Sequence, residues 1–219
     1  MSYPEWNPMG GGMRRGVLAL LACCLLFSTG ASAASAKKRN LVELIEQSDS
    51  ILVGAVQSVT DGIDARGVPY TEVTLRVDEK LRGKQAGTTY TFRQFGLTAP
   101  RKMANGRTLM AVTPDGWPRY IKDERVVMFL HAPARLTGLQ TAVGLEQGKL
   151  RISNNRVLSA TDNEGLFEGV KVASGLLKQE EAAMLAKQRG AVDAGAFLGL
   201  VRRAVKENWV SQGRMKNER

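Results

Sequence analysis

The spacing of apolar residues near position 40 predicts a short amphipathic helix. Apolar side chains recur at helical intervals between Leu41 and Ile45. Asn40 stands three residues before Glu43, the spacing of an N-cap residue and a carboxylate that bonds back to the first turn. We therefore expect an amphipathic helix over residues 40–48.

Beyond this helix the apolar pattern takes the period and length of β-strands. The continuous apolar run at 51–56 is typical of a central strand buried on both faces, and the Asp-Gly pair at 61–62 predicts the turn that ends it. Residues 70–77 alternate between apolar and polar side chains, which indicates a half-buried strand. A second alternating run at 89–96 follows after glycines, so these two strands are expected to form a hairpin.

Residues 97–122 carry prolines together with Asn-Gly and Asp-Gly pairs, which break any long regular element. A loop of this length in a compact domain is often functional or mobile. Regular structure resumes with the apolar run at 126–130, which predicts another buried strand. Residues 139–145 and 150–153, joined by a turn at Gln147-Gly148, predict a second hairpin. Several short strands separated by turn signals indicate a β-sandwich or small barrel.

The C-terminal part returns to helical composition. Residues 176–185 place apolar side chains among Lys, Gln, Glu and Ala, and Gly190 closes this predicted helix. Asp193 is expected to cap a second helix with one apolar face, and the polar stretch beyond Trp209 is expected to fray. The predicted divisions are a β-barrel domain at 37–172, a helical segment at 173–210 and a disordered tail at 211–219.

The first 36 residues have the pattern of a secretory signal peptide. Arg14 and Arg15 precede an apolar run at 16–27 that is too short to span a bilayer, and small residues follow at peptidase-site spacing. We therefore expect export to the periplasm or beyond the cell, with both cysteines removed in the cleaved segment. The alternatives are a lipid anchor at Cys23 and a true start at Met13.

The positive net charge of the chain favours anionic partners. The formal net charge is +10, and the basic residues occur in small separate groups, one of them in the 97–122 loop. A basic exported protein is attracted to anionic envelope polymers, lipid headgroups or nucleic acid. The alternative is that the charge serves only to keep the protein dissolved.

The order of these elements carries a family resemblance. The helix, the run at 48–56, the alternating strand at 71–77 and the segment at 123–130 follow the layout of netrin-module and TIMP-like domains. The chain also resembles cysteine-free bacterial exported proteins with a Val-Gly-Leu-x-Gln-Gly stretch, as at 143–148. The resemblance implies an OB-type five-stranded barrel with a terminal helix.

The same resemblance does not extend to an inhibitory mechanism. TIMP proteins present a mature N-terminal cysteine to the zinc of a metalloprotease. Here the expected mature chain starts near Ala34 or Lys37 and contains no cysteine. What the resemblance leaves open is a partnership with an exported protease through another surface, on fold analogy alone.

The sequence contains no pattern that requires a catalytic, metal or cofactor site. His131 is the single histidine, so a zinc site or a Ser-His-Asp triad would need carboxylates from distant positions, and no Gly-x-Ser-x-Gly elbow occurs. The acidic stretches at 61–64 and 162–165 are interpreted as turns rather than calcium loops. A hydrolase using His131 is kept as the alternative function.

We expect instead a non-enzymatic module that binds an exported protein, such as a protease or surface protein, or an anionic envelope polymer. A third function, basic oligonucleotide binding, would use strand aromatics, but the alternation predicts that Tyr90 and Phe92 face inward. The binding surface is expected to be an exposed patch that joins Arg93-Gln94-Phe95, at the end of the 89–96 strand, to the 97–122 loop. Its candidate residues are Arg93, Phe95, Arg101, Lys102, Arg107, Trp117, Arg119 and Tyr120.

Overall fold

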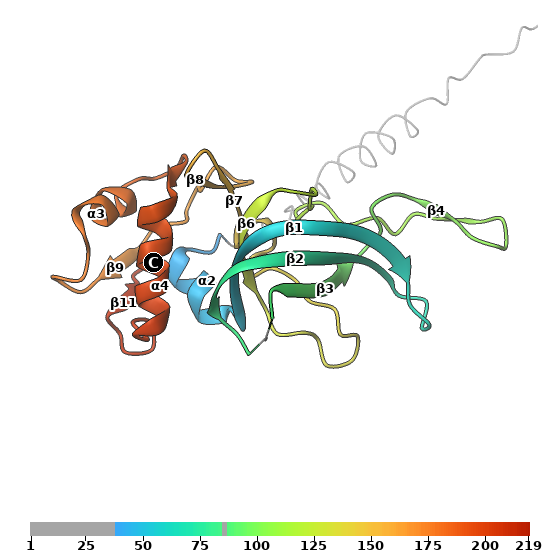
Figure 1. Ribbon diagram of the computed structural model, residues 1–219, viewed down its shortest axis with the longest axis horizontal. Coiled ribbons are helices and arrows are strands. Elements are labelled where there is room, and N and C mark those ends of the chain that lie inside the picture. Colours follow the sequence, from blue (N-terminus) through green and yellow to red (C-terminus); the bar gives the residue numbers. More distant parts are fainter. Residues whose placement is uncertain (1–37, 85–86) are drawn as a thin grey trace, which may run out of the picture. The chain divides into compact units, whose positions relative to one another are not determined.

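The computed structural model describes residues 38–84 and 87–219. The predicted signal peptide, with Cys23 and Met13, lies outside these residues. Within them the chain is mainly β, with one large antiparallel sheet and three α-helices (Figure 1). The prediction of a mainly β fold with a short N-terminal helix and helices near the C-terminus is therefore confirmed.

The sheet is built around its first strand. Its order is β10-β8-β7-β6-β1-β2-β3, and β1 pairs antiparallel with both β2 and β6 (Figure 1). The expected central strand and the expected β2–β3 hairpin are both present. The strands are β1 (Ser50–Ile63), β2 (Pro69–Arg82), β3 (Thr89–Phe95), β6 (Arg125–Leu130), β7 (Lys149–Ser153), β8 (Arg156–Ser159) and β10 (Val192–Asp193).

Alternate residues of β1 belong to two separate hydrophobic cores. Ile51 and Val53 pack in the core that contains the helices, whereas Leu52 and Val56 pack in a second core on the opposite face with β2 and β3. Strand β6 alternates in the same way. This division follows from the period of two along a strand, and it explains why the run at 51–56 contains no exposed position.

The three helices cover the first of these cores. Helix α2 (Leu41–Gln47) has the predicted capping box, because Asn40 Oδ1 accepts from Glu43 N at 3.1 Å and Glu43 Oε2 accepts from Asn40 N at 3.0 Å. Helix α3 (Gln179–Leu185) is shorter than predicted. Helix α4 (Ala194–Lys206) begins at the predicted N-cap, with Ala196 N donating to Asp193 Oδ1 at 2.9 Å.

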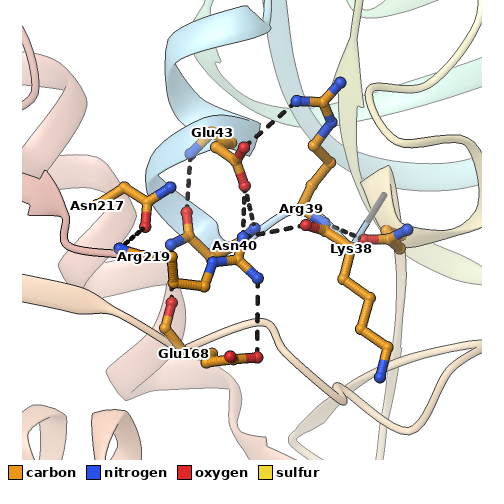
Figure 2. Close-up of polar contacts among 8 residues, drawn as sticks. Lys38, Arg39, Asn40, Glu43, Glu168, Asn217 and Arg219 are labelled. Atoms are coloured by element: carbon orange, nitrogen blue, oxygen red, sulfur yellow. Dashed lines mark hydrogen bonds and ion pairs between the residues drawn. The ribbon is translucent and has the colours of Figure 1, made fainter. Parts of the chain in front are cut away.

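The predicted disordered tail is wrong. Strand β11 (Met215–Asn217) pairs with β9 (Val170–Val172), and the Met215 side chain is fully buried. Arg219 donates to Glu43 Oε2 at 2.6 Å and to the Lys38 carbonyl at 3.0 Å (Figure 2). Ion pairing and strand pairing with distant residues therefore order this polar segment.

The predicted second hairpin is also in a different place. Residues 139–145 form only an isolated bridge, after which the 3-10 helix η1 (Leu145–Gly148) leads into β7. The hairpin is β7–β8, whose two-residue turn places Asn154 and Asn155 at φ values of 48° and 56°. Asparagine tolerates this left-handed conformation, which matches the twist of the paired strands.

The predicted turn after the central strand lies a few residues later than expected. Strand β1 continues through the Asp-Gly pair at 61–62 to Ile63. The chain then turns at Asp64, whose Oδ1 accepts from Arg66 N at 2.8 Å and from Val68 N at 2.9 Å. Pairing of 61–63 with β2 therefore outweighs the local turn preference.

The backbones of β1 and β2 approach closely at Gly54, so a side chain at this position should lower the stability of the fold. A Cβ at this position would lie 2.2 Å from the Arg76 carbonyl oxygen, so Gly54→Ala is expected to lower the free energy of unfolding by about 1–3 kcal/mol. In helix α4 the Cβ of Gly199→Ala has its nearest neighbour at 3.6 Å, and this control should raise stability by up to about 1 kcal/mol. Urea unfolding of both variants tests the contrast, and a Gly54→Ala protein as stable as the parent would contradict it.

Candidate functional site

A cavity of about 180 Å³ lies between the sheet and the 97–122 loop. The sheet contributes Val59 from β1, Thr71 from β2 and Gln94 from β3. The loop side is formed by Leu97, Thr98, Val112, Thr113, Arg119 and Tyr120. Two of the predicted site residues, Arg119 and Tyr120, therefore line this partly open cavity.

Gln94 lines this cavity because of its position in β3. It shares the inward face of the strand with Tyr90 and Phe92, and its side chain is only 1% exposed. Its Nε2 donates to the Pro118 carbonyl at 2.9 Å, while its buried Oε1 has no hydrogen-bond partner in the described chain. The sequence placed Gln94 in an exposed patch with Arg93 and Phe95, and this is wrong, because the alternation along β3 turns Gln94 inward.

Tyr120 was predicted to be exposed, and this is wrong. The residue is 9% exposed, and its ring meets Phe92 edge-to-face at 5.6 Å between centroids. Its hydroxyl forms no hydrogen bond with any described residue. Burial, with a smaller effect from the Glu124 charge, raises the pKa of Tyr120 far above its usual value. The hydroxyl therefore stays protonated and can donate.

A partly buried ion pair positions the segment that carries Tyr120. Lys149 Nζ in β7 lies 2.5 Å from Glu124 Oε1, which also accepts from Ile121 N at 2.8 Å. The same ammonium group donates to the Arg119 carbonyl and lies 5.1 Å from the centre of the Tyr120 ring. These contacts hold residues 119–124 against the sheet.

Arg101, one of the candidate binding residues, anchors the other end of the loop. Its guanidinium pairs with Asp61 of β1, which also accepts from Thr98 N at 2.8 Å and from Thr98 Oγ1 at 2.5 Å. Partial burial raises the pKa of Asp61, but the Thr98 hydrogen bonds and the Arg101 charge outweigh burial, so that the pKa is lowered overall. The carboxylate is therefore a charged anchor at neutral pH.

Between these anchors the chain forms a small hairpin instead of a wholly irregular loop. Strands β4 (Arg101–Lys102) and β5 (Thr108–Leu109) pair antiparallel and extend away from the sheet (Figure 1). Lys102 and Arg107 are exposed, and the described residues offer neither of them an ion pair. Met110, the residue after β5, is 66% exposed.

Of the remaining predicted residues, Arg93 and Phe95 lie on the outward face of β3 and Trp117 packs on Phe95 from the loop. Arg93 pairs with Glu72 at 2.7 Å and lies over the Tyr70 ring at 4.2 Å. Phe95 meets Trp117 edge-to-face, with 6.4 Å between ring centroids. The expected patch is therefore divided, because Gln94, which stands between Arg93 and Phe95, points to the opposite face of the sheet.

The alternative chemistry gains no support from the geometry at His131. Its backbone N–H donates to the Thr141 carbonyl at 3.0 Å, which ties the end of β6 to the following segment. In residues 38–84 and 87–219, no three His, Cys, Asp or Glu side chains gather as a metal site would require. Asp162, in the second acidic turn, pairs with Arg189 at 3.1 Å.

Comparison with known proteins does not place the chain in a family. No protein-family model matches it, and no curated protein matches it significantly. The resemblance to netrin-module and TIMP-like domains therefore stays a prediction. None of the helices in the described ranges has the length and hydropathy needed to cross a bilayer.

Two buried tyrosines should respond oppositely to the same substitution. Tyr90 donates to Gln140 Oε1 at 2.7 Å, so Tyr90→Phe should lower the free energy of unfolding by about 1 kcal/mol. The Tyr120 hydroxyl has no partner among the described residues, so Tyr120→Phe removes an unmet group and should raise stability by about 1 kcal/mol. Urea titration measures both, and equal losses would mean that the Tyr120 hydroxyl is bonded in solution.

The Asp61 anchor should make part of the stability depend on pH. Its folded pKa is lowered below the ordinary value of 3.8, so its contribution is complete above that value and is lost as the pH falls through the folded pKa. Asp61→Asn should therefore reduce the melting temperature at pH 7, and the difference from the parent should shrink in strong acid. Melting curves between pH 7 and pH 2 test this, and a difference independent of pH would contradict it.

Proposed function

We propose that the chain is an exported, non-enzymatic binding module that holds an anionic envelope polymer with the 97–122 loop. The observation that carries this proposal is the β4–β5 hairpin, which extends from the sheet with Lys102 and Arg107 exposed. The hairpin is rooted at Asp61 and lies beside a cavity. The hairpin therefore presents two positive charges away from the sheet, and the ion pair at Asp61 fixes the point where it joins the sheet.

The exposed cations of the domain differ in whether an acidic side chain neutralises them. Many exposed arginines of the domain have acidic partners, as Arg202 has in Glu79 at 2.7 Å and Arg93 in Glu72. Lys102 and Arg107 have no such partner in the described chain, so their field is not neutralised locally. Cations of this kind attract an anionic polymer with a strength that falls as salt rises.

The finer fold assignment, an OB-type barrel, belongs to the same proposal. The order β7-β6-β1-β2-β3 supplies five neighbouring strands, which supports it. Full closure would require β3 and β7 to pair, and the described residues contain no such pairing. Export rests on the sequence of residues 1–36, and the netrin-module resemblance supports the fold alone.

A protein partner, such as a protease or surface protein, is the second candidate. The exposed apolar side chains Met110 and Ile121, at 66% and 67%, favour it because such groups gain from contact with another apolar surface. Oligonucleotide binding has less support. Tyr90 and Phe92 lie in the core and offer no face on which a base could stack.

The polymer proposal is tested by removing charge from the hairpin. The double variant Lys102→Gln, Arg107→Gln should bind purified peptidoglycan sacculi about thirtyfold more weakly than the parent, because each of the two lost cations near an anionic surface costs roughly 1 kcal/mol. Sedimentation binding at low and high salt measures this.

A matched control removes the same charge elsewhere. Lys171→Gln with Lys187→Gln changes two exposed lysines away from the loop. The control should bind as the parent does. If sacculus binding weakened equally in both variants, the effect would be one of general charge. Binding whose strength does not change with salt concentration would contradict the proposal.

A further inference from the structure

The cavity under the 97–122 loop has an interior suited to an uncharged group. Its deep polar side chains are Thr71, Gln94, Thr113 and Tyr120, and Leu97 and Val112 add apolar surface. Arg119 is the one charged side chain of the lining, and it is exposed. A charged group held inside would lose its hydration without gaining a buried counter-ion, which is strongly unfavourable.

The hydrogen-bonding capacity left in this interior is specific. Thr71 Oγ1 already donates to the Gly96 carbonyl at 2.7 Å, and Thr113 Oγ1 donates to the Leu97 carbonyl at 3.3 Å. Gln94 Oε1 remains as an acceptor and the Tyr120 hydroxyl as a donor, both without a partner among the described residues. A complementary ligand therefore donates one hydrogen bond and accepts another.

The size of the cavity limits what can enter. At about 180 Å³ it is smaller than the roughly 300–1,000 Å³ of pockets that enclose drug-sized ligands. It fits a terminal group of a larger molecule better than a chain that must pass through. A secondary amide ending in a methyl group meets each requirement: an N–H donor, a carbonyl acceptor and a small apolar end.

We propose that this cavity binds the acetamido group of N-acetylated amino sugars, the class of unit from which an anionic envelope glycan is built. The amide N–H donates to Gln94 Oε1, the carbonyl accepts from the Tyr120 hydroxyl, and the methyl group packs against Leu97 and Val112. This assignment rests on the proposed function, because it names the unit of the polymer that the loop holds. Arg119 stands at the exposed side of the cavity for the anionic remainder.

Binding requires a small movement of the loop. Neither Gln94 Oε1 nor the Tyr120 hydroxyl is exposed to solvent, so the ligand reaches them only when the neighbouring wall shifts. The contacts that hold this wall are the Gln94 Nε2 bond to Pro118 and the hydrogen bonds that Leu97 forms with Ala111 and Thr113 in an isolated bridge. The Asp61 anchor and the Lys149–Glu124 pair lie at its two ends and need not break.

The test measures binding of small sugars to the purified protein by calorimetry and thermal shift. The probes are the trimer of N-acetylglucosamine, the corresponding glucosamine trimer and a glucose trimer. Only the N-acetylated trimer should raise the melting temperature. Tyr120→Phe should weaken its binding about tenfold, the worth of one good hydrogen bond, while Tyr90→Phe binds as the parent does.

A second variant blocks the space itself. Val112→Phe places a larger side chain in the cavity wall and should abolish binding of the N-acetylated trimer. Equal binding of all three trimers, or no binding of any, would overturn the acetamido assignment. Comparable binding of a short uncharged peptide amide would also overturn it, because the site would then recognise a peptide.

The two proposals fail in different ways. If the hairpin variant Lys102→Gln, Arg107→Gln still binds the N-acetylated trimer but the parent does not bind sacculi, the cavity assignment stands and the polymer function is wrong. If the parent binds sacculi and Tyr120→Phe binds them and the trimer equally well, the polymer function stands and the acetamido assignment is wrong.

Discussion

The N-terminal half of β1 is buried on both faces, and the two hydrophobic cores of the described domain meet at this strand. Ile51 and Val53 face the helices, and Leu52 and Val56 face the aromatic core beside the cavity. A slip of one residue in the pairing of β1 would exchange these sets, so the register is strongly specified. The positions of β2, β3 and β6 follow from it, since each is paired to β1 directly or through one neighbour.

The register of β1 also determines the geometry of the candidate site, because β2 and β3 form part of the cavity wall. The alternation along β3 points Gln94 inward, beside the aromatic core. The two ion pairs that anchor the loop then determine which loop residues lie opposite Gln94. Asp61 fixes the start of the loop and the Lys149–Glu124 pair fixes its end. Ion pairs of this kind contribute little net stability after desolvation, and their value is in specifying one arrangement. The shape of the cavity therefore depends on the sheet register and on these two electrostatic contacts.

Local signals in the sequence were sufficient for elements that depend on near neighbours. The Asn40–Glu43 capping box, the Asp193 N-cap and the buried run at 51–56 could all be predicted, because periodicity or a residue three positions away determines them. The end of the chain could not. Order at Met215 and Arg219 depends on partners more than 40 residues away, and composition alone predicted fraying.

The site shows the same division between local and distant information. The 97–122 loop was identified from its turn residues, but the burial of Tyr120 depends on Phe92 and Lys149, which come from separate strands. The pairing of Arg101 with Asp61 likewise joins residues forty positions apart. Charge and aromatic composition could therefore single out this loop as a candidate, while the division of its residues into anchors, cavity walls and exposed cations required the tertiary contacts.

The separate anchoring of the two ends of the loop has a consequence for limited proteolysis. Lys102 and Arg107 are in an exposed hairpin, where a protease that cleaves after basic residues has access to the backbone. The fragment before the cut contains β1, β2 and β3, and the fragment after it contains β6, so the pairing of β1 with β6 and the two shared hydrophobic cores hold the fragments together. A nicked protein would migrate as two pieces on a denaturing gel yet elute as one particle, with its cavity walls still joined to the domain.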